Sequence, residues 1–205
     1  MLDHILLGID DLDRGIAFME ERTGVRAAFG GVHPGRGTRN ALLRLGTRRY
    51  LEIIAPDPKQ TSLAAYPELR TMREPRLLTW AVHTDDIVAV AKKLTNAGFA
   101  IDGPADGSRA RPDGRLLHWK ALRLKDDRGG LLPFFIEWGP DSVHPSVDAP
   151  SGCQLVHFAA TSSNPEGLRG VVARLGVELE VEESSAKPHL RARIAGAKGT
   201  AELSS

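Results

Sequence analysis

Residues 2–11 read LDHILLGIDD, an apolar run followed by two carboxylates, and this stretch decides the fold. The run contains β-branched residues and predicts a buried strand over Leu2–Ile9. Asp11 or Asp13 can cap a helix over about Leu12–Arg22, which Gly24 would end. Three more strands are expected over residues 25–29, 40–45 and 48–54. The first unit therefore has the order strand, helix, strand, strand, strand.

The same order of elements returns twice along the chain. In the second unit we expect a strand at residues 77–82, a helix at 86–97 and strands at 99–101, 116–124 and 132–138. In the third, shorter unit we expect a strand at 154–160, a helix at 165–175 and strands near 179–183, 189–194 and 200–203. Repeats of this kind constrain the architecture strongly. They predict an α+β fold of repeated βαβββ units.

The segments between the units predict where the domains end. A polar connector covers residues 56–75, with a short helix near residues 63–69, and a linker with three prolines covers residues 139–152. We therefore expect one domain over residues 1–140, built from units 1–56 and 76–140. The third unit, residues 151–205, would stand beside it.

Composition narrows the class of protein. The chain has 205 residues, 26% of them charged, and a formal net charge of +1. Such a balance gives no reason to expect nucleic acid or a membrane surface as a partner. A single cysteine, Cys153, cannot form a disulfide within the chain. No apolar run approaches the length of a membrane span, and no signal peptide is evident. We expect a cytoplasmic protein.

In the first unit a His stands early in the first strand (His4) and a Glu stands late in the last strand (Glu52). A repeated βαβββ unit with this arrangement resembles the vicinal oxygen chelate superfamily. That superfamily includes glyoxalase I, extradiol dioxygenases and the fosfomycin- and bleomycin-resistance proteins. Within it, the chain is similar to the glyoxalase-like domain family through HPGRGTRN at residues 33–40 and LPFFIEW at residues 132–138. The resemblance covers residues 1–140. It implies that the first two units curve together into a half-open barrel.

The resemblance also implies a divalent metal ion inside the barrel. His4, Glu52 and Glu137 match the ligand positions, and imidazole with carboxylate suits Zn, Mn, Ni, Co or Fe. Thr79 stands where a fourth ligand would be, and a neutral hydroxyl is a poor ligand. As an alternative, His4 is a core histidine bonded to the backbone. The two glutamates could also act as bases without metal, because a buried carboxylate is costly unless it is paired.

The segment 33–40 allows two interpretations. It could be a turn that merely needs its glycines. It could instead be a mobile rim in which Thr38, Arg39 and Asn40 bind a polar ligand and His33 acts as an acid or base. Under the second interpretation the predicted catalytic residues are Glu52, Glu137 and His33.

His118 and Trp119 are further candidates for the same pocket. Side chains alternate along a strand, so only one of the two can point inward, and the sequence does not show which. His118 or His33 could also supply the fourth metal ligand, which is missing at position 79.

The third unit contains its own pair, His157 and Glu202, which occupy the positions of His4 and Glu52. Since the number of units is odd, one apolar face would lack a partner within the chain. Pairing of residues 150–205 with the same unit of a second chain would cover that face with twofold symmetry. We therefore expect a homodimer.

Three functions are compatible with these residues. The favoured one is a metal-dependent lyase or isomerase acting on a small oxygen-rich molecule whose neighbouring oxygens bind the ion. Dioxygenase chemistry fits least, because it normally needs two histidines and one carboxylate. The alternative is a metal-free protein that sequesters a small molecule, with an aromatic pocket drawn from Trp80, Trp119, Phe135 and Trp138. The third is a structural module.

Overall fold

The computed structural model describes residues 1–61, 63 and 66–205. The strands are β1 (Leu2–Gly8), β2 (Ala28–His33), β3 (Thr38–Gly46), β4 (Arg49–Pro56), β5 (Arg76–His83), β6 (Ile101–Ala110), β7 (Leu116–Leu124), β8 (Phe134–Trp138), β9 (Gln154–Ser162), β10 (Glu180–Glu183), β11 (His189–Ala195) and β12 (Thr200–Ser204). The helices are α1 (Leu12–Thr23), α2 (Ile87–Asn96) and α3 (Pro165–Leu175). Short 3-10 turns lie at Pro67–Thr71 and Pro145–Val147.

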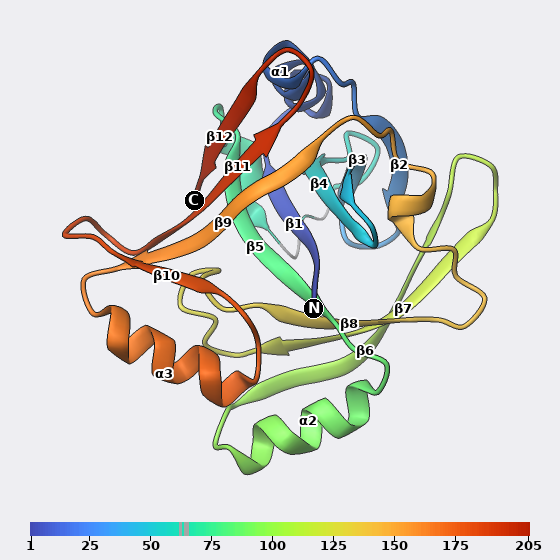
Figure 1. Cartoon of the computed structure of the whole chain (residues 1–205). Coiled ribbons are helices and arrows are strands. Elements are labelled where there is room, and N and C mark those ends of the chain that lie inside the picture. Colours follow the sequence, from blue (N-terminus) through green and yellow to red (C-terminus); the bar gives the residue numbers. More distant parts are fainter. Residues whose placement is uncertain (62, 64–65) are drawn as a thin grey trace.

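The first two units form one large sheet with the strand order β2-β3-β4-β1-β5-β8-β7-β6. Within each unit the first strand runs parallel to the last, β1 to β4 and β5 to β8. The antiparallel pairing of β1 with β5 joins the two units. The sheet curls into a half-open barrel (Figure 1). This confirms the α+β fold of repeated βαβββ units.

The helix after β1 begins and ends where the sequence predicts. The Asp11 side chain accepts a hydrogen bond from the Arg14 backbone N–H at 2.9 Å, which makes it the N-cap. Gly24 adopts φ +79° and its N–H bonds to the carbonyl of Glu20, which is a left-handed C-cap. Leu12, Ile16 and Met19 bury one face of α1 against the sheet.

The glycine-containing segment expected as a loop is largely strand. β2 extends to His33 and β3 begins at Thr38, and these two residues pair directly. Only a tight turn remains between them, and Gln60 fixes it by accepting the Gly35 N–H at 2.9 Å and donating to the His33 carbonyl at 3.2 Å. This agrees with the first interpretation of segment 33–40, because Gly35 and Gly37 adopt φ +70° and +75° in that turn. The flanking glycines of β2 become strand because pairing across the sheet overrides their weak strand propensity. The expected helix at residues 63–69 lies partly outside the described residues.

The third unit has the predicted order of elements but a different pairing of strands. Its sheet has the order β10-β9-β11-β12, so β9 lies between β10 and β11. β12 pairs with β11 at the far side and is not a neighbour of β9 in the strand order. The first strand and the last strand of this unit are therefore separated, unlike β1 and β4.

The small sheet packs on the outer face of the large sheet with β12 beside α1, and α3 lies on the side of α2 (Figure 1). The Phe158 ring meets Trp80 edge to face, with 5.4 Å between ring centroids. Leu190 and Ile194 of β11 belong to the same buried cluster as Leu43 of β3. The apolar face that suggested a homodimer is thus covered by the chain itself, and this removes the reason for expecting one.

Within the part of the chain that the structure describes, no helix combines the length and the apolar character needed to cross a membrane.

Candidate functional site

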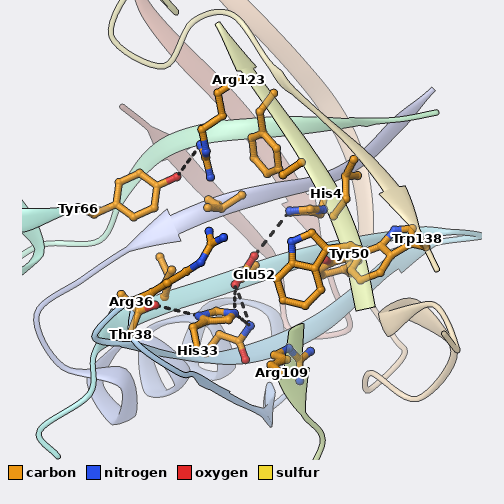
Figure 2. Close-up of a pocket in the computed structure, with 17 residues that line it drawn as sticks. His4, His33, Arg36, Thr38, Tyr50, Glu52, Tyr66, Arg109, Arg123 and Trp138 are labelled. Carbon is orange, nitrogen blue, oxygen red and sulfur yellow. Dashed lines mark hydrogen bonds and ion pairs between the residues drawn. The ribbon is translucent and has the colours of Figure 1, made fainter. Parts of the chain in front are cut away.

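A narrow cavity of about 70 Å³ lies on the inner face of the half-barrel (Figure 2). The parallel pairing of β1 with β4 places Leu6 beside Glu52 and His4 beside Tyr50. Because side chains alternate along a strand, His4, Tyr50 and Glu52 all face the cavity. Its remaining lining residues come from the other strands of the sheet and from the connector: His33, Arg36, Thr38, Asn40, Ile54, Tyr66, Arg109, Trp119, Ala121, Arg123, Phe134, Ile136 and Trp138.

His4 is held in one orientation by its neighbours. Its Nδ1 lies 2.6 Å from the Asp3 carboxylate, and its ring stacks on Tyr50 with 4.6 Å between centroids. A carboxylate only accepts hydrogen bonds, so the hydrogen belongs on Nδ1. The other ring nitrogen, Nε2, then faces the Glu52 carboxylate at 3.6 Å. His4 is therefore hydrogen-bonded to a carboxylate, and not to the backbone as the alternative of a core histidine would require.

Asp3 is a site residue that the sequence interpretation missed. It lies within an irregularity in the pairing of β1 with β5, between Leu2 and His4, which allows the adjacent Asp3 and His4 side chains to meet. Asp3 also accepts hydrogen bonds from Trp138 Nε1 at 3.0 Å and His144 Nε2 at 3.1 Å. Burial alone would raise the pKa of Asp3, but the hydrogen bonds from His144 and His4 lower it well below its ordinary value. His144 belongs to the predicted linker, so that segment supports the site.

Glu52 is buried yet ionised at neutral pH. Burial would raise its pKa, but the charges of His33 and His4 and a hydrogen bond from Asn40 lower it below the ordinary value. The Asn40 amide donates to one carboxylate oxygen at 2.7 Å, and His33 Nε2 lies 3.7 Å from the same oxygen. His4 approaches the other oxygen. The carboxylate therefore lies between two imidazoles.

The structure brings His33, Thr38 and Asn40 to Glu52, as the sequence predicts. His33 Nδ1 lies 2.8 Å from the Thr38 hydroxyl, and burial lowers the pKa of His33 against the opposing effect of the Glu52 charge. Arg39 differs. It alternates with Thr38 and Asn40 on β3, and it does not line the cavity.

Of the pair on β7, Trp119 points inward and His118 is exposed. The backbone of Gly107 on β6 lies directly against the Trp119 ring, where a Cβ would come within 2.4 Å of ring atoms. Any other residue at position 107 would push Trp119 out of its place. His118 lies on the opposite face of β7 from Trp119 and does not line the cavity.

Glu137, predicted as a third ligand and a catalytic residue, does not lie with His4 and Glu52. β8 joins β5 with Phe134 opposite Ala81, so the inward positions of β8 are Phe134, Ile136 and Trp138. Glu137 faces outward and accepts the backbone N–H of Ile87 at 2.6 Å, at the start of α2. This correction follows from alternation along the strand.

Thr79, the expected fourth position, is likewise absent from the lining of this cavity. It lines a neighbouring hollow that it shares with Tyr66 and Arg123.

Three arginines in the cavity were also missed. Arg36 lies in the turn before β3, Arg123 on β7 and Arg109 on β6. Arg109 is buried and donates to the carbonyl of Gly30, which links β6 to β2 across the opening of the barrel, and burial lowers its pKa. Arg123 lies four residues after Trp119 on the same strand, so alternation of side chains could have predicted that both face the cavity. The other two depend on how β2 and β6 approach each other.

The pair predicted in the third unit is not brought together. Glu202 forms an exposed ion pair with Arg193 at 2.8 Å. His157 lies near Glu180 and Glu182, at 3.7 Å and 3.3 Å. Within residues 1–61, 63 and 66–205, those three form the only group of at least three metal-type donors whose ligand atoms all lie within 4.8 Å. All three are partly or fully exposed, and none lines the cavity.

Comparisons with known proteins agree with this architecture. The profile of a family described as the glyoxalase-like domain matches residues 2–176. A solved structure of a hypothetical protein from Staphylococcus aureus is 21% identical, covers 99% of this chain and 84% of its own, and has a TM-score of 0.70. A methylmalonyl-CoA epimerase from Streptomyces coelicolor, in complex with 2-nitronate-propionyl-CoA, is 18% identical, covers 70% and 97%, and has a TM-score of 0.50.

The methylmalonyl-CoA epimerase from Mycobacterium tuberculosis is 22% identical, with 68% of this chain and 88% of that chain covered and a TM-score of 0.49. No curated protein matches the chain. At these identities the similarity concerns the fold alone.

Proposed function

This chain belongs to the glyoxalase-like domain family, and from that premise we propose that it is an isomerase or lyase that moves a proton in a small oxygen-rich molecule. One observation carries the proposal. Glu52 is a buried carboxylate with a lowered pKa, and it faces the cavity between His4 and His33. A buried carboxylate in a cavity whose pKa is shifted by specific charged and hydrogen-bonding partners is a candidate for acid–base chemistry.

In this mechanism Glu52 takes a proton from a carbon beside a carbonyl group. Such a carbon loses its proton only if the charge that develops on the carbonyl oxygen is stabilised. The buried guanidinium of Arg109 lines the same cavity and supplies positive charge there. The Asn40 amide keeps the carboxylate in place, and Asp3 keeps the His4 ring oriented with Nε2 facing the cavity. Return of the proton to another position completes an isomerisation.

The residues present also suit a divalent metal ion. His4 and His33 would bind it through Nε2 and Glu52 through its carboxylate. Asp3 and Thr38 hold the opposite ring nitrogens, as is typical of metal-binding histidines. These ligand atoms are not all within 4.8 Å of one another, so binding would draw them closer. When bound, Zn, Mn, Fe, Co or Ni would polarise a substrate oxygen.

Hydrogen exchange tests the proposal without knowledge of the natural substrate. The protein is incubated in D2O with 2-oxo acids, hemithioacetals of 2-oxoaldehydes and branched acyl thioesters, with and without Mn or Co. Proton NMR then follows loss of the signal beside the carbonyl. We expect exchange with at least one class, lost in Glu52→Gln and retained in Glu202→Gln. Full exchange in Glu52→Gln would overturn the role of Glu52.

A second function, metal-free binding of a small molecule, is favoured by the aromatic wall of the cavity. The Trp119 and Trp138 rings lie 5.8 Å apart and both line it. Stacking surfaces of this kind bind planar ligands without any chemistry. Saturable binding of a compound in the panel, with no exchange in any metal condition, would favour this function over the first.

A further inference from the structure

Two arginines point into the cavity from opposite sides. Arg36 is presented by the turn between β2 and β3, and Arg123 by the far end of β7. Figure 2 shows both guanidinium groups directed toward the space above Glu52. Both side chains are half-buried. Since these segments lie far apart in the sequence, it is the curvature of the sheet that brings the two cations to one cavity.

Neither guanidinium is neutralised by the protein. Arg123 donates to the Tyr66 hydroxyl at 3.4 Å and lies 4.5 Å from the centre of the Phe134 ring, and both partners are uncharged. Within the described part of the chain, Arg36 forms no ion pair with a carboxylate, and Glu52 is the only carboxylate that lines the cavity. With Arg109, three guanidinium groups face one carboxylate. The cavity therefore carries an excess of positive charge.

An unneutralised cation that has lost part of its water is unfavourable unless a partner restores its interactions. The partner that fits a guanidinium is an oxyanion, because its N–H groups match two oxygens of a carboxylate or phosphate at once. The Tyr66 hydroxyl is buried, and burial raises its pKa, so it keeps its proton and can donate to the same anion. The site thus offers donors and positive charge together.

We propose that the substrate carries an ionised carboxylate or phosphate group, which binds between Arg36 and Arg123. That group would leave the neighbouring carbon facing Glu52. The assignment of the anion site stands on the arginines alone, whereas the orientation of the reacting carbon rests on the proposed function.

Binding of small anions by isothermal titration calorimetry tests the proposal. The probes are pyruvate for a carboxylate, inorganic phosphate for a phosphate and methyl pyruvate as the neutral analogue of pyruvate. We compare the full chain with Arg36→Gln, Arg123→Gln and the matched control Arg26→Gln, whose arginine pairs with Glu20 at the surface. Loss of one charge-assisted contact should weaken anion binding about tenfold or more, and Arg26→Gln should change it by less than about twofold.

Glu52→Gln gives a second, opposite expectation. Removing the one negative charge of the cavity should strengthen binding of the anion while it abolishes hydrogen exchange. Preference for pyruvate or for phosphate decides between the two anions. Equal affinity for pyruvate and methyl pyruvate together with no binding of phosphate, or undiminished anion binding in both arginine variants, would overturn the proposal. Anion binding without any exchange would leave this site intact and remove only the proposed reaction.

Discussion

The first and third units share an order of elements but differ in how their strands pair. In the first unit β1 lies beside β4, so His4 and Glu52 face one cavity with 3.6 Å between them. In the third unit β11 separates β9 from β12, and Glu202 pairs with Arg193 at the surface instead of meeting His157. Equal spacing in the sequence therefore does not give equal proximity in space. Strand pairing decides which polar residues can form a site.

The sharpest test of this comparison replaces the two corresponding glutamates. Glu52→Gln should reduce hydrogen exchange by about 100- to 10,000-fold, the usual contribution of a general base. Glu202→Gln should leave exchange unchanged and cost less than about 1 kcal/mol of stability, because its ion pair is exposed. Exchange rates from NMR and unfolding in urea measure both effects. A comparable loss of exchange in the two variants would contradict the comparison.

The two regions should be alike in a second respect, since they share one core. Leu43 of β3 and Leu190 of β11 are both fully buried. Truncation of either to alanine should cost about 2–5 kcal/mol. Trp80, Trp119 and Trp138 all lie in the first two units. We therefore expect Leu190→Ala to shift the tryptophan fluorescence transition in urea as much as the circular dichroism transition. A fluorescence transition that did not move would show that the third unit unfolds by itself.

The carboxylates beside the two histidines should differ in importance. Asp3 is buried and accepts three hydrogen bonds, from His4, Trp138 and His144. Asp3→Asn should cost about 1–3 kcal/mol and disturb the tautomer of His4. Glu180→Gln, beside the partly exposed His157, should cost less than about 1 kcal/mol. Nitrogen-15 NMR of the imidazole rings reports the tautomer, and an unchanged His4 spectrum in Asp3→Asn would contradict the role of Asp3.

The smallest expected effect concerns pH. Burial lowers the pKa of His33 below its ordinary value of 6.5, so the unfolded chain binds a proton at this residue more readily than the folded chain. Stability should therefore fall as pH decreases below about 6.5. His33→Gln should flatten that dependence, whereas His157→Gln serves as a control for loss of an imidazole elsewhere. Asp3 and Glu52, whose pKa values are also lowered, lose their contributions only at more acidic pH.

Much of the fold was predictable because it depends on local signals. The apolar strand after Met1, the cap at Asp11 and the glycine at position 24 define the start of the first unit, and the structure confirms them. β7 and α3 have the predicted bounds. The pairing of the third unit was not predictable, because an order of elements leaves several pairings open. β6 was predicted too short, since its Gly, Pro and Asp residues are poor strand formers that tertiary pairing accommodates.

Only the part of the candidate site that one strand pairing brings together was predictable from the sequence. His4 and Glu52 follow from the parallel pairing of β1 with β4. Glu137 was misplaced because similarity in sequence to Glu52 does not fix the face of the strand that it occupies. Asp3 and His144 could not be found, since one depends on an irregularity in strand pairing and the other on a linker that folds back over the site.

The contact between β2 and β6 has a consequence for how the molecules behave in a crowded solution. Gly31 lies so close to the carbonyl of Ala110 that an added Cβ would be 2.4 Å from it. The two edges of the large sheet thus shield each other from strands of other molecules. In the described part of the chain, β10 and β12 are then the open edges. β10 reads EVEE, and β12 carries Glu202. Charged edge strands resist aggregation, so these acidic residues favour solubility.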